Sequence, residues 1–270
     1  MGNRNNLSGH CAIVTGAAGG IGSAFCQELA SRGCSLILID VSRDKMHEKY
    51  LMLRNSYPDV RVYKLPTDLT SPDLIEIIER FLHQEGLDPD ILINNAGIFA
   101  FAPATEISDS RIDCFIDLHV KAVTNLSKWM ASRRVPKGSG WILNMSSMSC
   151  WAPMPGLSMY AATKAYIRVF SRSLHYDVRD SGVRVMVACP GGIATDLFGL
   201  PDNLKHLALN LGAIATPRNF ARKAVTRLMK GRQQYINGFV NRIAIFLVGI
   251  MPTSVRMMVK HRLLDKGIKR

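Results

Sequence analysis

The residues best suited to chemistry lie in one segment, WILNMSSMSCWAPMPGLSMYAATKAYIRVF, at positions 141–170. Tyr160 and Lys164 are four positions apart where the spacing is helical, so their side chains share one face of the predicted helix. A nearby ammonium favours the phenolate and would lower the tyrosine pKa from about 10 toward the range useful at neutral pH. Ser147 follows an apolar strand and can reach the same point, where a hydroxyl beside an acidic phenol suits the oxygen of a carbonyl or an alcohol. The competing interpretation is a chance pair, a half-buried tyrosine beside a solvated lysine.

A glycine-rich turn lies between a predicted strand at 11–14 and a predicted helix. Glycines let a backbone approach a pyrophosphate closely, and the free N–H groups of a helix start favour its negative charge. The four residues in question are Gly16, Gly20, Ile21 and Gly22. A second predicted strand, 35–39, ends in Asp40, about twenty residues after the glycines, where an acid can bind the ribose hydroxyls of a dinucleotide.

Asp40 also bears on which nicotinamide cofactor the chain would bind. A carboxylate near the adenosine ribose repels the 2′-phosphate of NADP, so NAD(H) is favoured over NADP(H). Arg43 leaves NADP(H) open, because its guanidinium could turn toward a phosphate if Asp40 moved aside. Asp40 could also be an ordinary turn acid.

Short apolar runs alternate with helical patterns along the rest of the chain, which predicts a parallel sheet with helices on both faces. The remaining predicted strands are 60–65, 90–93, 141–145 and 183–188, and the helices are 43–56, 74–82, 108–133 and 158–180. The fold class is therefore α/β, a single Rossmann-type doubly wound parallel sheet.

Ligands bind such sheets at the carboxyl ends of the strands, and polar or small residues follow each predicted strand. Asp68 follows the third strand and is expected near adenine, while also capping the next helix. The fourth strand ends in the sequence NNAG, with Asn95, Ala96 and Gly97. The strand at 183–188 is followed by a turn that can present backbone amides and a hydroxyl to a carboxamide, and that contains Pro190, Gly191, Ile193 and Thr195.

With these motifs placed, the sequence resembles the short-chain dehydrogenase/reductase family over about residues 8 to 240. Five motifs agree with the family in order and spacing: TGAAGGIG at 15–22, Asp40, NNAG at 94–97, Ser147 with YAATK at 160–164, and PGGIAT at 190–195. The resemblance implies a nicotinamide dinucleotide and a homo-dimer or homo-tetramer built on the long helices at 108–133 and 158–180. It also implies that Tyr160 is the general acid/base, that Ser147 polarises the carbonyl, and that Lys164 holds the nicotinamide ribose and lowers the Tyr160 pKa.

One position departs from the family pattern. The family usually has an asparagine in the helix before the serine strand, where it supports a water-linked proton path, and here the residue is His119. A histidine can bind a water, and it can also take up a proton near neutral pH. The alternative is a packed histidine with no catalytic role.

Composition narrows the partners and the compartment. The formal net charge of +13 favours an anionic partner, such as a phosphorylated cofactor, acidic lipid or acidic carrier protein. No nucleic-acid partner is expected, because there is no zinc-finger spacing and no aromatic-interleaved basic stripe. The six cysteines are scattered without a C-x-x-C pair, so no metal site is expected. Free cysteines and the absence of an apolar signal core before the first strand indicate a cytoplasmic protein.

The residues expected on the substrate side are mostly apolar, which favours a bulky ketone or secondary alcohol, steroid-like or long-chain lipid. They are Phe99, Phe101, Met148, Cys150, Trp151 and Met154, with Leu197, Phe198 and Leu200 in a predicted lid at 196–215. A second enzyme candidate is a 3-oxoacyl carrier-protein reductase. The candidate from another class is a non-catalytic nicotinamide-sensing protein.

The chain divides into a dinucleotide-binding and catalytic domain at 1–240 and an apolar, basic extension at 241–270. The apolar run at 243–251 is too short to span a bilayer and ends at Pro252. An amphipathic helix is expected next, and six basic residues against one acid after Pro252 favour contact with the inner face of an anionic membrane. The competing interpretation is a lid over its own or a neighbouring subunit.

Overall fold

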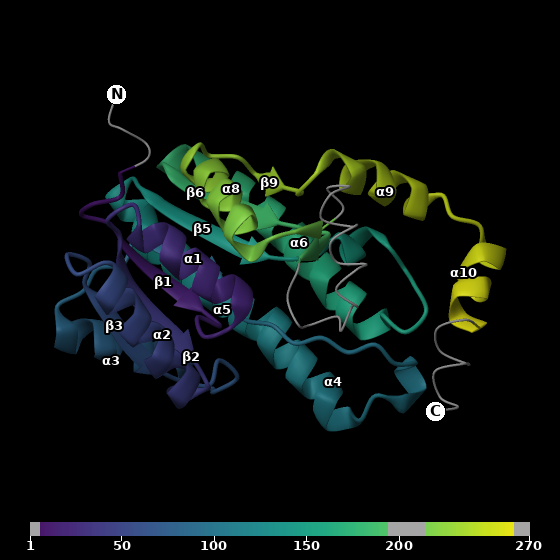
Figure 1. The fold of residues 1–270 in the computed structure, drawn as a ribbon, viewed down its shortest axis with the longest axis horizontal. Helices are drawn as coiled ribbons and strands as arrows, with labels where there is room; N and C mark the ends of the chain where they lie inside the picture. Colours follow the sequence, from purple (N-terminus) through teal and green to yellow (C-terminus); the bar gives the residue numbers. More distant parts are fainter. Residues whose placement is uncertain (1–5, 194–213, 262–270) are drawn as a thin grey trace.

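The computed structural model describes residues 6–193 and 214–261, and this part of the chain forms one seven-stranded parallel sheet with helices on both sides (Figure 1). The strand order is β3-β2-β1-β4-β5-β6-β9. The strands are β1 (Cys11–Thr15), β2 (Ser35–Asp40), β3 (Val62–Pro66), β4 (Ile91–Asn94), β5 (Gly140–Met145), β6 (Val183–Ala188) and β9 (Gln234–Tyr235). The predicted doubly wound Rossmann-type sheet is confirmed.

Two layers of helices enclose the sheet. The cluster on one face includes side chains of α1 (Gly20–Ala30), α2 (Arg43–Ser56) and α8 (Pro217–Met229). The cluster on the other includes side chains of α3 (Leu74–Glu85), α5 (Val123–Arg134) and α6 (Ser158–Val178). Helix α8 was not predicted from the sequence.

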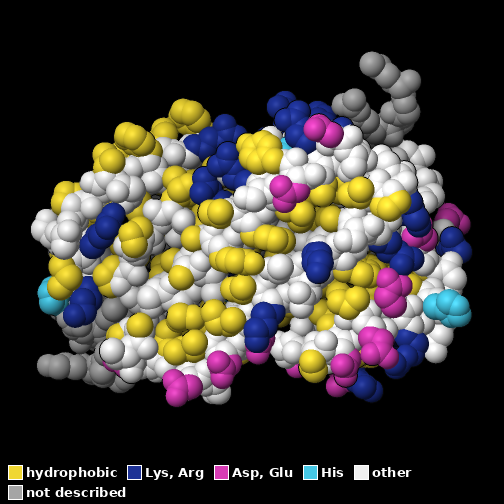
Figure 2. Space-filling view, turned by 180° about the vertical axis from the view of Figure 1, so that it is seen from behind, with side chains coloured by type: hydrophobic (Ala, Val, Ile, Leu, Met, Phe, Trp, Pro, Cys, Tyr) yellow, Lys and Arg dark blue, Asp and Glu magenta, His cyan; other side chains and the backbone are white. Residues whose placement is uncertain are grey.

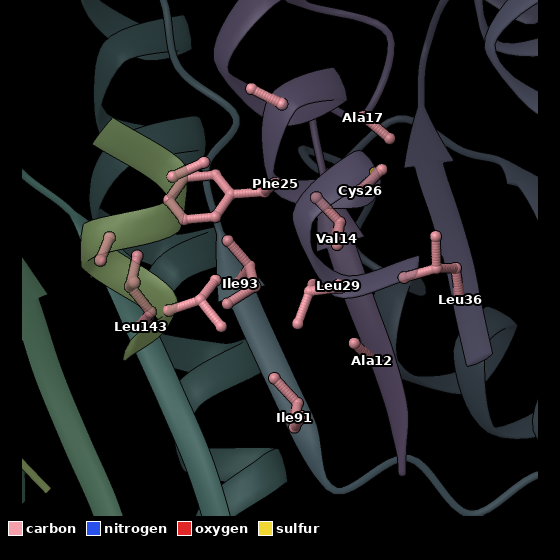
Figure 3. Packing of buried hydrophobic residues seen from close by; sticks show 14 of the residues in the cluster. Ala12, Val14, Ala17, Phe25, Cys26, Leu29, Leu36, Ile91, Ile93 and Leu143 are labelled. Atoms are coloured by element: carbon pink, nitrogen blue, oxygen red, sulfur yellow. The ribbon is translucent and has the colours of Figure 1, made fainter. Parts of the chain in front are cut away.

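Successive residues of the strands enter opposite core clusters. Val14 and Leu36 belong to the cluster under α1, whereas Ile13 and Ile37 belong to the cluster on the other face. Figure 3 shows part of the first cluster, where Phe25 of α1 faces the central strands. Because both faces are buried, these strands read in the sequence as continuous apolar runs, as parallel strands generally do.

The helix predicted at 108–133 is not continuous. The structure has α4 (Asp109–Ile116), a π-helical segment η2 (Asp117–Ala122) and then α5. A π-turn adds a residue to the local repeat, which rotates the following side chains relative to an uninterrupted α-helix. The segment brings His119 and Ala122 into the buried interior.

The third strand also differs from its prediction. It was expected to stop before Pro66, yet Pro66 pairs with Asp40 in the register of β2 and β3. Since β3 is the edge strand of the sheet, the missing N–H of proline costs no ladder hydrogen bond there.

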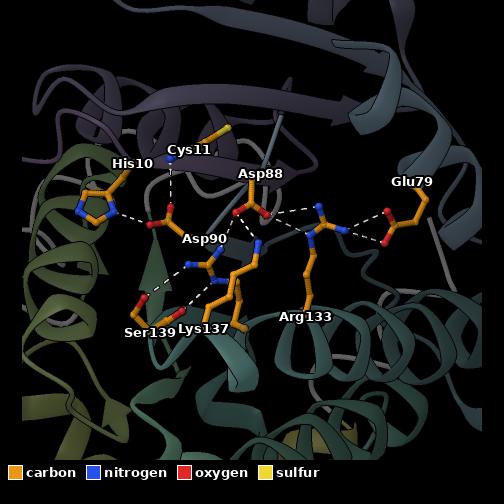
Figure 4. Close-up of polar contacts among 9 residues, drawn as sticks. His10, Cys11, Glu79, Asp88, Asp90, Arg133, Lys137 and Ser139 are labelled. Atoms are coloured by element: carbon orange, nitrogen blue, oxygen red, sulfur yellow. Dashed lines mark hydrogen bonds and ion pairs between the residues drawn. The ribbon is translucent and has the colours of Figure 1, made fainter. Parts of the chain in front are cut away.

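A cluster of charged side chains ties together the amino ends of the central strands (Figure 4). Asp88, just before β4, pairs with Arg134 at 3.0 Å and Lys137 at 2.6 Å. Asp90 pairs with His10 at 2.5 Å, and this contact raises the pKa of the imidazole. The cluster therefore connects the segments that precede β1, β4 and β5, at the end of the sheet opposite to the predicted ligand site.

The C-terminal extension consists of α9 (Phe239–Gly249) and α10 (Thr253–Lys260), separated at Pro252 as expected. Asn241 is buried, and α9 packs against the segment η4 (Met148–Trp151) that follows Ser147. The boundary expected at 240/241 therefore falls inside a helix that contacts the body of the protein. Among the described residues, the structure has no helix long and apolar enough to cross a bilayer.

Candidate active site

The glycine turn joins β1 to α1 and leaves the start of the helix open. Gly16 has φ of 63°, and a Cβ on it would lie 2.9 Å from the Ala96 Cα, so only glycine fits. A Cβ on Gly22 would lie 2.0 Å from the Gly16 carbonyl oxygen. Gly19 and Gly20 are exposed, and the N-cap of α1 makes no side-chain hydrogen bond. The first N–H groups of α1 are thus available to an anion, which fits the pyrophosphate of a dinucleotide.

Asp40, at the end of β2, is fixed against this turn. Its Oδ2 atom accepts a hydrogen bond from the Ala18 N–H at 2.9 Å, and its Oδ1 atom accepts from the Ser42 N–H at 3.0 Å. The carboxylate is thereby held beside the glycine turn and remains half-buried. This is the side of the sheet where an adenosine ribose would lie.

Thr15 joins the end of β1 to the end of β4 through hydrogen bonds, and the sequence analysis did not identify this residue. The Thr15 hydroxyl oxygen accepts hydrogen bonds from the N–H groups of Asn95 at 3.0 Å and Ala96 at 3.1 Å. The Asn95 amide donates to the carbonyl oxygens of Thr15 and Gly16. These bonds lie at β1 and β4, where the strand order reverses and dinucleotides bind in doubly wound sheets.

Asp68 plays a different local role from the one expected. Its Oδ1 atom accepts hydrogen bonds from the Thr70 N–H at 2.9 Å and the Thr70 hydroxyl at 2.8 Å. Helix α3 begins at Leu74 with Asp73 as its N-cap residue. The expected capping of this helix by Asp68 is wrong, because the carboxylate stabilises the preceding turn instead. Asp68 itself is exposed.

The structure brings Ser147, Tyr160 and Lys164 together. Ser147 lies two residues beyond the end of β5 and immediately before η4, and its side chain is close enough to Tyr160 on α6 to influence the pKa of the phenol. Lys164, one turn further along α6, is buried and lies with its Nζ atom 5.7 Å from the centroid of the Tyr160 ring. The same ammonium donates to the Met145 carbonyl oxygen at 3.1 Å.

The pKa values differ from the expected pattern. Burial raises the pKa of Tyr160, and the nearby Ser147 hydroxyl only partly opposes this effect. Burial also lowers the pKa of Lys164 to about 8, although Cys189 nearby opposes the shift. The expected lowering of the Tyr160 pKa by Lys164 is therefore not observed, since the ammonium lies over the ring and bonds to the Met145 carbonyl rather than to the phenol.

His119 is fully buried in the π-helical segment, and both ring nitrogens have protein partners. Nε2 accepts a hydrogen bond from the Ile98 N–H at 3.0 Å, which assigns the proton to Nδ1. Nδ1 lies 3.0 Å from the Thr163 hydroxyl oxygen, to which it donates. Burial, with a smaller effect from Lys164, lowers the pKa of His119 to about 2. The expected proton uptake near neutral pH is wrong, because charging the ring would break the bond to Ile98 and bury a cation.

A network of buried polar side chains lies beneath the ends of β4 and β5, and the sequence analysis did not predict it. The Asn94 side-chain amide donates to the Asn144 side-chain oxygen, Oδ1, at 2.8 Å and to the Ser127 hydroxyl at 3.1 Å. The Asn144 amide donates in turn to the Ser171 hydroxyl at 2.9 Å. The network thus links β4 and β5 to the helices α5 and α6.

The turn after β6 meets the C-terminal extension. The Gly191 N–H donates to the Asn237 side chain at 2.7 Å, and a Cβ on Gly191 would lie 2.4 Å from the Asn241 amide nitrogen. Ile193 belongs to the short strand β7 (Gly192–Ile193), which pairs with β8 (Ile214–Ala215). Thr195 and almost all of the predicted lid lie outside the described residues.

Aromatic side chains border the hydroxyls. The Phe99 ring meets the Tyr160 ring edge to face at 5.0 Å between centroids, and Phe101 is 41% exposed. Trp151 is partly buried and stacks with the Arg168 guanidinium at 4.4 Å from the ring centroid. Leu197, Phe198 and Leu200 lie outside the described residues. Within those residues, no group of three or more potential metal ligands occurs.

Comparisons with known proteins give the following relatives. The family model described as short chain dehydrogenase matches residues 10–202. The very-long-chain 3-oxoacyl-CoA reductase-B of Danio rerio is 30% identical over 241 residues, which cover 88% of this chain and 74% of that protein. The inactive hydroxysteroid dehydrogenase-like protein 1 of Homo sapiens is 33% identical over 226 residues, covering 82% of this chain and 66% of that protein.

The fold is also found among solved structures. A short-chain dehydrogenase from Sphingobium yanoikuyae in complex with NADPH superposes with a TM-score of 0.75. It is 26% identical in sequence, and the match covers 91% of this chain and 97% of that one.

Proposed function

This chain belongs to the short-chain dehydrogenase family, and we propose that it interconverts a secondary alcohol and a ketone on a bulky apolar substrate, steroid-like or long-chain lipid. Family membership makes it an NAD(P)-dependent oxidoreductase. The observation that carries the substrate proposal is the convergence of the Ser147 and Tyr160 hydroxyls beside the Phe99 ring. Two converging hydroxyls can bind one oxygen, while the aromatic surroundings favour an apolar carbon skeleton.

In the reducing direction, Ser147 donates a hydrogen bond to the substrate carbonyl oxygen, and Tyr160 transfers its phenolic proton to that oxygen. A bound nicotinamide dinucleotide would supply the hydride. The Lys164 ammonium, held by the Met145 carbonyl, is near enough to stabilise the negative charge left on Tyr160. The phenol is then reprotonated from solvent.

His119 is a positioning residue in this scheme rather than an acid or base. Its ring joins the Ile98 backbone, next to Gly97, to Thr163 on the helix that carries Tyr160 and Lys164. The Thr163 side chain is itself held in place, because its hydroxyl donates to the Met159 carbonyl oxygen on the same helix at 3.0 Å. The ring thus fixes the distance between the NNAG loop and the catalytic helix.

NAD(H) is the preferred cofactor in this proposal. The Asp40 carboxylate stands beside the glycine turn, where its charge opposes a 2′-phosphate. Gly16, Gly20, Ile21 and Gly22 would hold the pyrophosphate, and Asn95, Ala96 and Gly97 would border the nicotinamide half. Pro190, Gly191, Ile193 and Thr195 would contact its carboxamide.

The relatives favour two narrower alternatives. The Danio rerio protein is named for 3-oxoacyl-CoA reduction, which supports a 3-oxoacyl thioester, including one on an acidic carrier protein that the net charge of +13 would attract. The human relative is named inactive, which favours a non-catalytic nicotinamide-binding protein. The intact trio of Ser147, Tyr160 and Lys164 favours turnover over this last candidate.

The deciding experiment follows NADH and NADPH absorbance with sterols, long-chain ketones and 3-oxoacyl thioesters, using the Tyr160→Phe variant as a blank. Turnover of the apolar ketones by the wild type supports the proposal. Turnover restricted to thioesters favours the reductase alternative. Cofactor binding without turnover of any of the three classes contradicts the enzyme proposal and favours a sensing role.

Contact with a membrane surface completes the proposal. Hydrophobic side chains gather over α9 on the face seen at the upper left of Figure 2. They recur at helical spacing and are exposed: Phe239, Ile243, Phe246, Leu247 and Ile250. Arg242 is exposed on the same helix, and Arg256 of α10 donates to the Val248 carbonyl oxygen, which holds α10 against the end of α9. An apolar stripe with basic neighbours suits the interface of an anionic leaflet.

A homo-oligomer would use another surface. On α6, the apolar side chains of Tyr166, Val169 and Tyr176 are exposed. The Tyr166 hydroxyl bonds to Thr124 of α5 at 2.8 Å, so both long helices contribute to one face. This face supports the pairing of two copies through α5 and α6, and it leaves α9 free for lipid.

A further inference from the structure

Two cysteines from different parts of the chain meet beside the catalytic serine. Beyond the ends of β5 and β6, the Ser146 N–H donates to the Ala188 carbonyl oxygen and the Met148 N–H to the Pro190 carbonyl oxygen, each at 2.8 Å. Cys189 lies between these two bonds and is fully buried. Segment η4 then turns back, with the Cys150 N–H bonded to the Ser147 carbonyl oxygen at 3.2 Å.

This turn places Cys150 against the end of β6. Its side chain packs on the small cluster that contains Cys189 and Val187, and the two thiols are close enough to influence each other's protonation. Both thiols also interact with the Ser146 hydroxyl, which itself donates to the Lys164 carbonyl oxygen at 2.6 Å. The thiol pair is therefore part of the same hydrogen-bonded surroundings as the catalytic helix.

The two thiols differ in a way that suits oxidation. Cys150 is partly exposed, and the neighbouring Cys189 thiol lowers its pKa against the opposing effect of burial, with help from Ser146 and Arg168. Cys189 is buried, and burial raises its pKa. A thiolate reacts with peroxide far faster than a thiol, so Cys150 would be attacked first and Cys189 would remain as its protonated partner.

We propose that Cys150 and Cys189 form a reversible oxidation site that switches off the enzyme; the loss of activity, though not the disulfide, rests on the function proposed above. The Cys150 thiolate attacks one oxygen of hydrogen peroxide; the O–O bond breaks, the sulfur becomes a sulfenic acid, and the other oxygen leaves as hydroxide. The Cys189 thiol then attacks that sulfur, forming the disulfide and releasing water. The two sulfurs together lose two electrons, which the peroxide gains.

The disulfide changes the active site because a covalent bond is shorter than any contact between two thiols. The sulfurs must approach to about 2.05 Å, which draws η4 toward the end of β6. Ser147 immediately precedes η4, so its hydroxyl moves relative to Tyr160. A misplacement on the order of 1 Å is enough to cost about 10²-fold in rate.

The test treats the full chain with hydrogen peroxide, blocks free thiols by alkylation and maps peptides by mass spectrometry. Cys114→Ser is the matched control, because Cys114 is also a partly exposed thiol on the described chain but lies on α4. Wild type and Cys114→Ser should form the Cys150–Cys189 disulfide and lose at least tenfold of their activity, and dithiothreitol should restore it. Cys150→Ser should lose less than twofold relative to its own untreated activity.

A second variant isolates the first chemical step. In Cys189→Ala the sulfenic acid has no resolving thiol, so dimedone should label Cys150 in this variant and not in the wild type. Recovery of both cysteines as free alkylated thiols after peroxide would overturn the inference, as would a disulfide that leaves activity unchanged. If the reduced protein turns over no ketone yet forms the disulfide, the oxidation site stands and the proposed function fails.

Discussion

The Nε2 atom of His119 accepts a hydrogen bond from the Ile98 N–H at 3.0 Å, across 21 positions of the chain. A backbone N–H can only donate, so this single contact fixes which ring nitrogen carries the proton and directs the other nitrogen to Thr163. The first prediction follows from this geometry. His119→Phe should reduce kcat and lower the free energy of unfolding by about 1–3 kcal/mol, because Ile98 and Thr163 both lose a partner.

The pH profile separates positioning from proton transfer. Since the pKa of His119 is about 2, its replacement should leave the shape of the kcat profile between pH 6 and 9 unchanged. His119→Asn, whose amide oxygen can accept from Ile98, should recover part of the rate. A shifted limb in the profile of either variant would instead make His119 a member of the proton path.

Tyr160→Phe should reduce turnover by on the order of 10²-fold or more, because only the proton-donating hydroxyl is removed. Cofactor affinity, measured by NADH fluorescence, should change little, and the Phe99 contact should keep the ring in place. Near-normal turnover by the purified variant would disprove the assignment of Tyr160 as the acid.

Lys164→Met should raise the stability of the cofactor-free protein at pH 7 while abolishing activity. Burial lowers the Lys164 pKa from 10.5 to about 8, which corresponds to a cost on the order of 3 kcal/mol for keeping the ammonium charged in the fold. That gain is reduced by the lost bond to the Met145 carbonyl, so Tm should rise by a few degrees.

The pH dependence has a definite sign. Below pH 8 the Lys164 amine is protonated in both the folded and the unfolded chain, so the full cost of burying the ammonium is present. Between pH 8 and 10.5 only the unfolded chain keeps Lys164 protonated, so the wild type gains stability as the pH rises. The difference in stability between the wild type and Lys164→Met therefore narrows. Thermal melts of both proteins from pH 7 to 10 measure this, and a gap that widens would refute it.

Asp40→Asn should narrow or reverse the preference for NAD, because the amide keeps an acceptor for the Ala18 N–H but removes the charge. The ratio of kcat/KM for NADP and NAD decides the matter. Tm serves as the control for the glycine turn. An unchanged ratio with an unchanged Tm would mean that Asp40 does not face the ribose.

Replacing Phe246 and Leu247 together by serine should weaken co-sedimentation with anionic vesicles without loss of activity toward a soluble ketone. Both side chains are exposed, at 68% and 54%, so no core packing is removed. Val41→Ser is the matched control, because Val41 directly follows β2 and is 72% exposed. Truncation after Gly238 is a poorer test, because it also removes Asn241 from its place beside Gly191.

Binding should weaken with salt yet persist in part, since the Lys and Arg contribution is screened and the apolar one is not. Equal sedimentation of the double variant and the wild type at low salt would contradict the membrane proposal. Loss of ketone turnover in the double variant without vesicles would make α9 a lid.

Local spacing was enough to predict much of this protein. The alternating apolar runs predicted the sheet because each strand has to bury both of its faces, as Ile13 and Val14 do. The turn at Gly16 was predictable because the steric freedom of glycine is a property of the residue itself. The shared face of Tyr160 and Lys164 followed from the helical repeat.

Only the tertiary structure decided what depends on partners distant in sequence. The hydrogen bond from Asn95 to Thr15 joins positions 80 apart, and the Cys150–Cys189 pair is created by the parallel alignment of β5 and β6. The pKa values of Tyr160 and His119 depend on how completely other segments exclude water from them, which no local pattern records. The sequence thus determined which groups face the same edge of the sheet, and the packing around them decided their protonation and contacts.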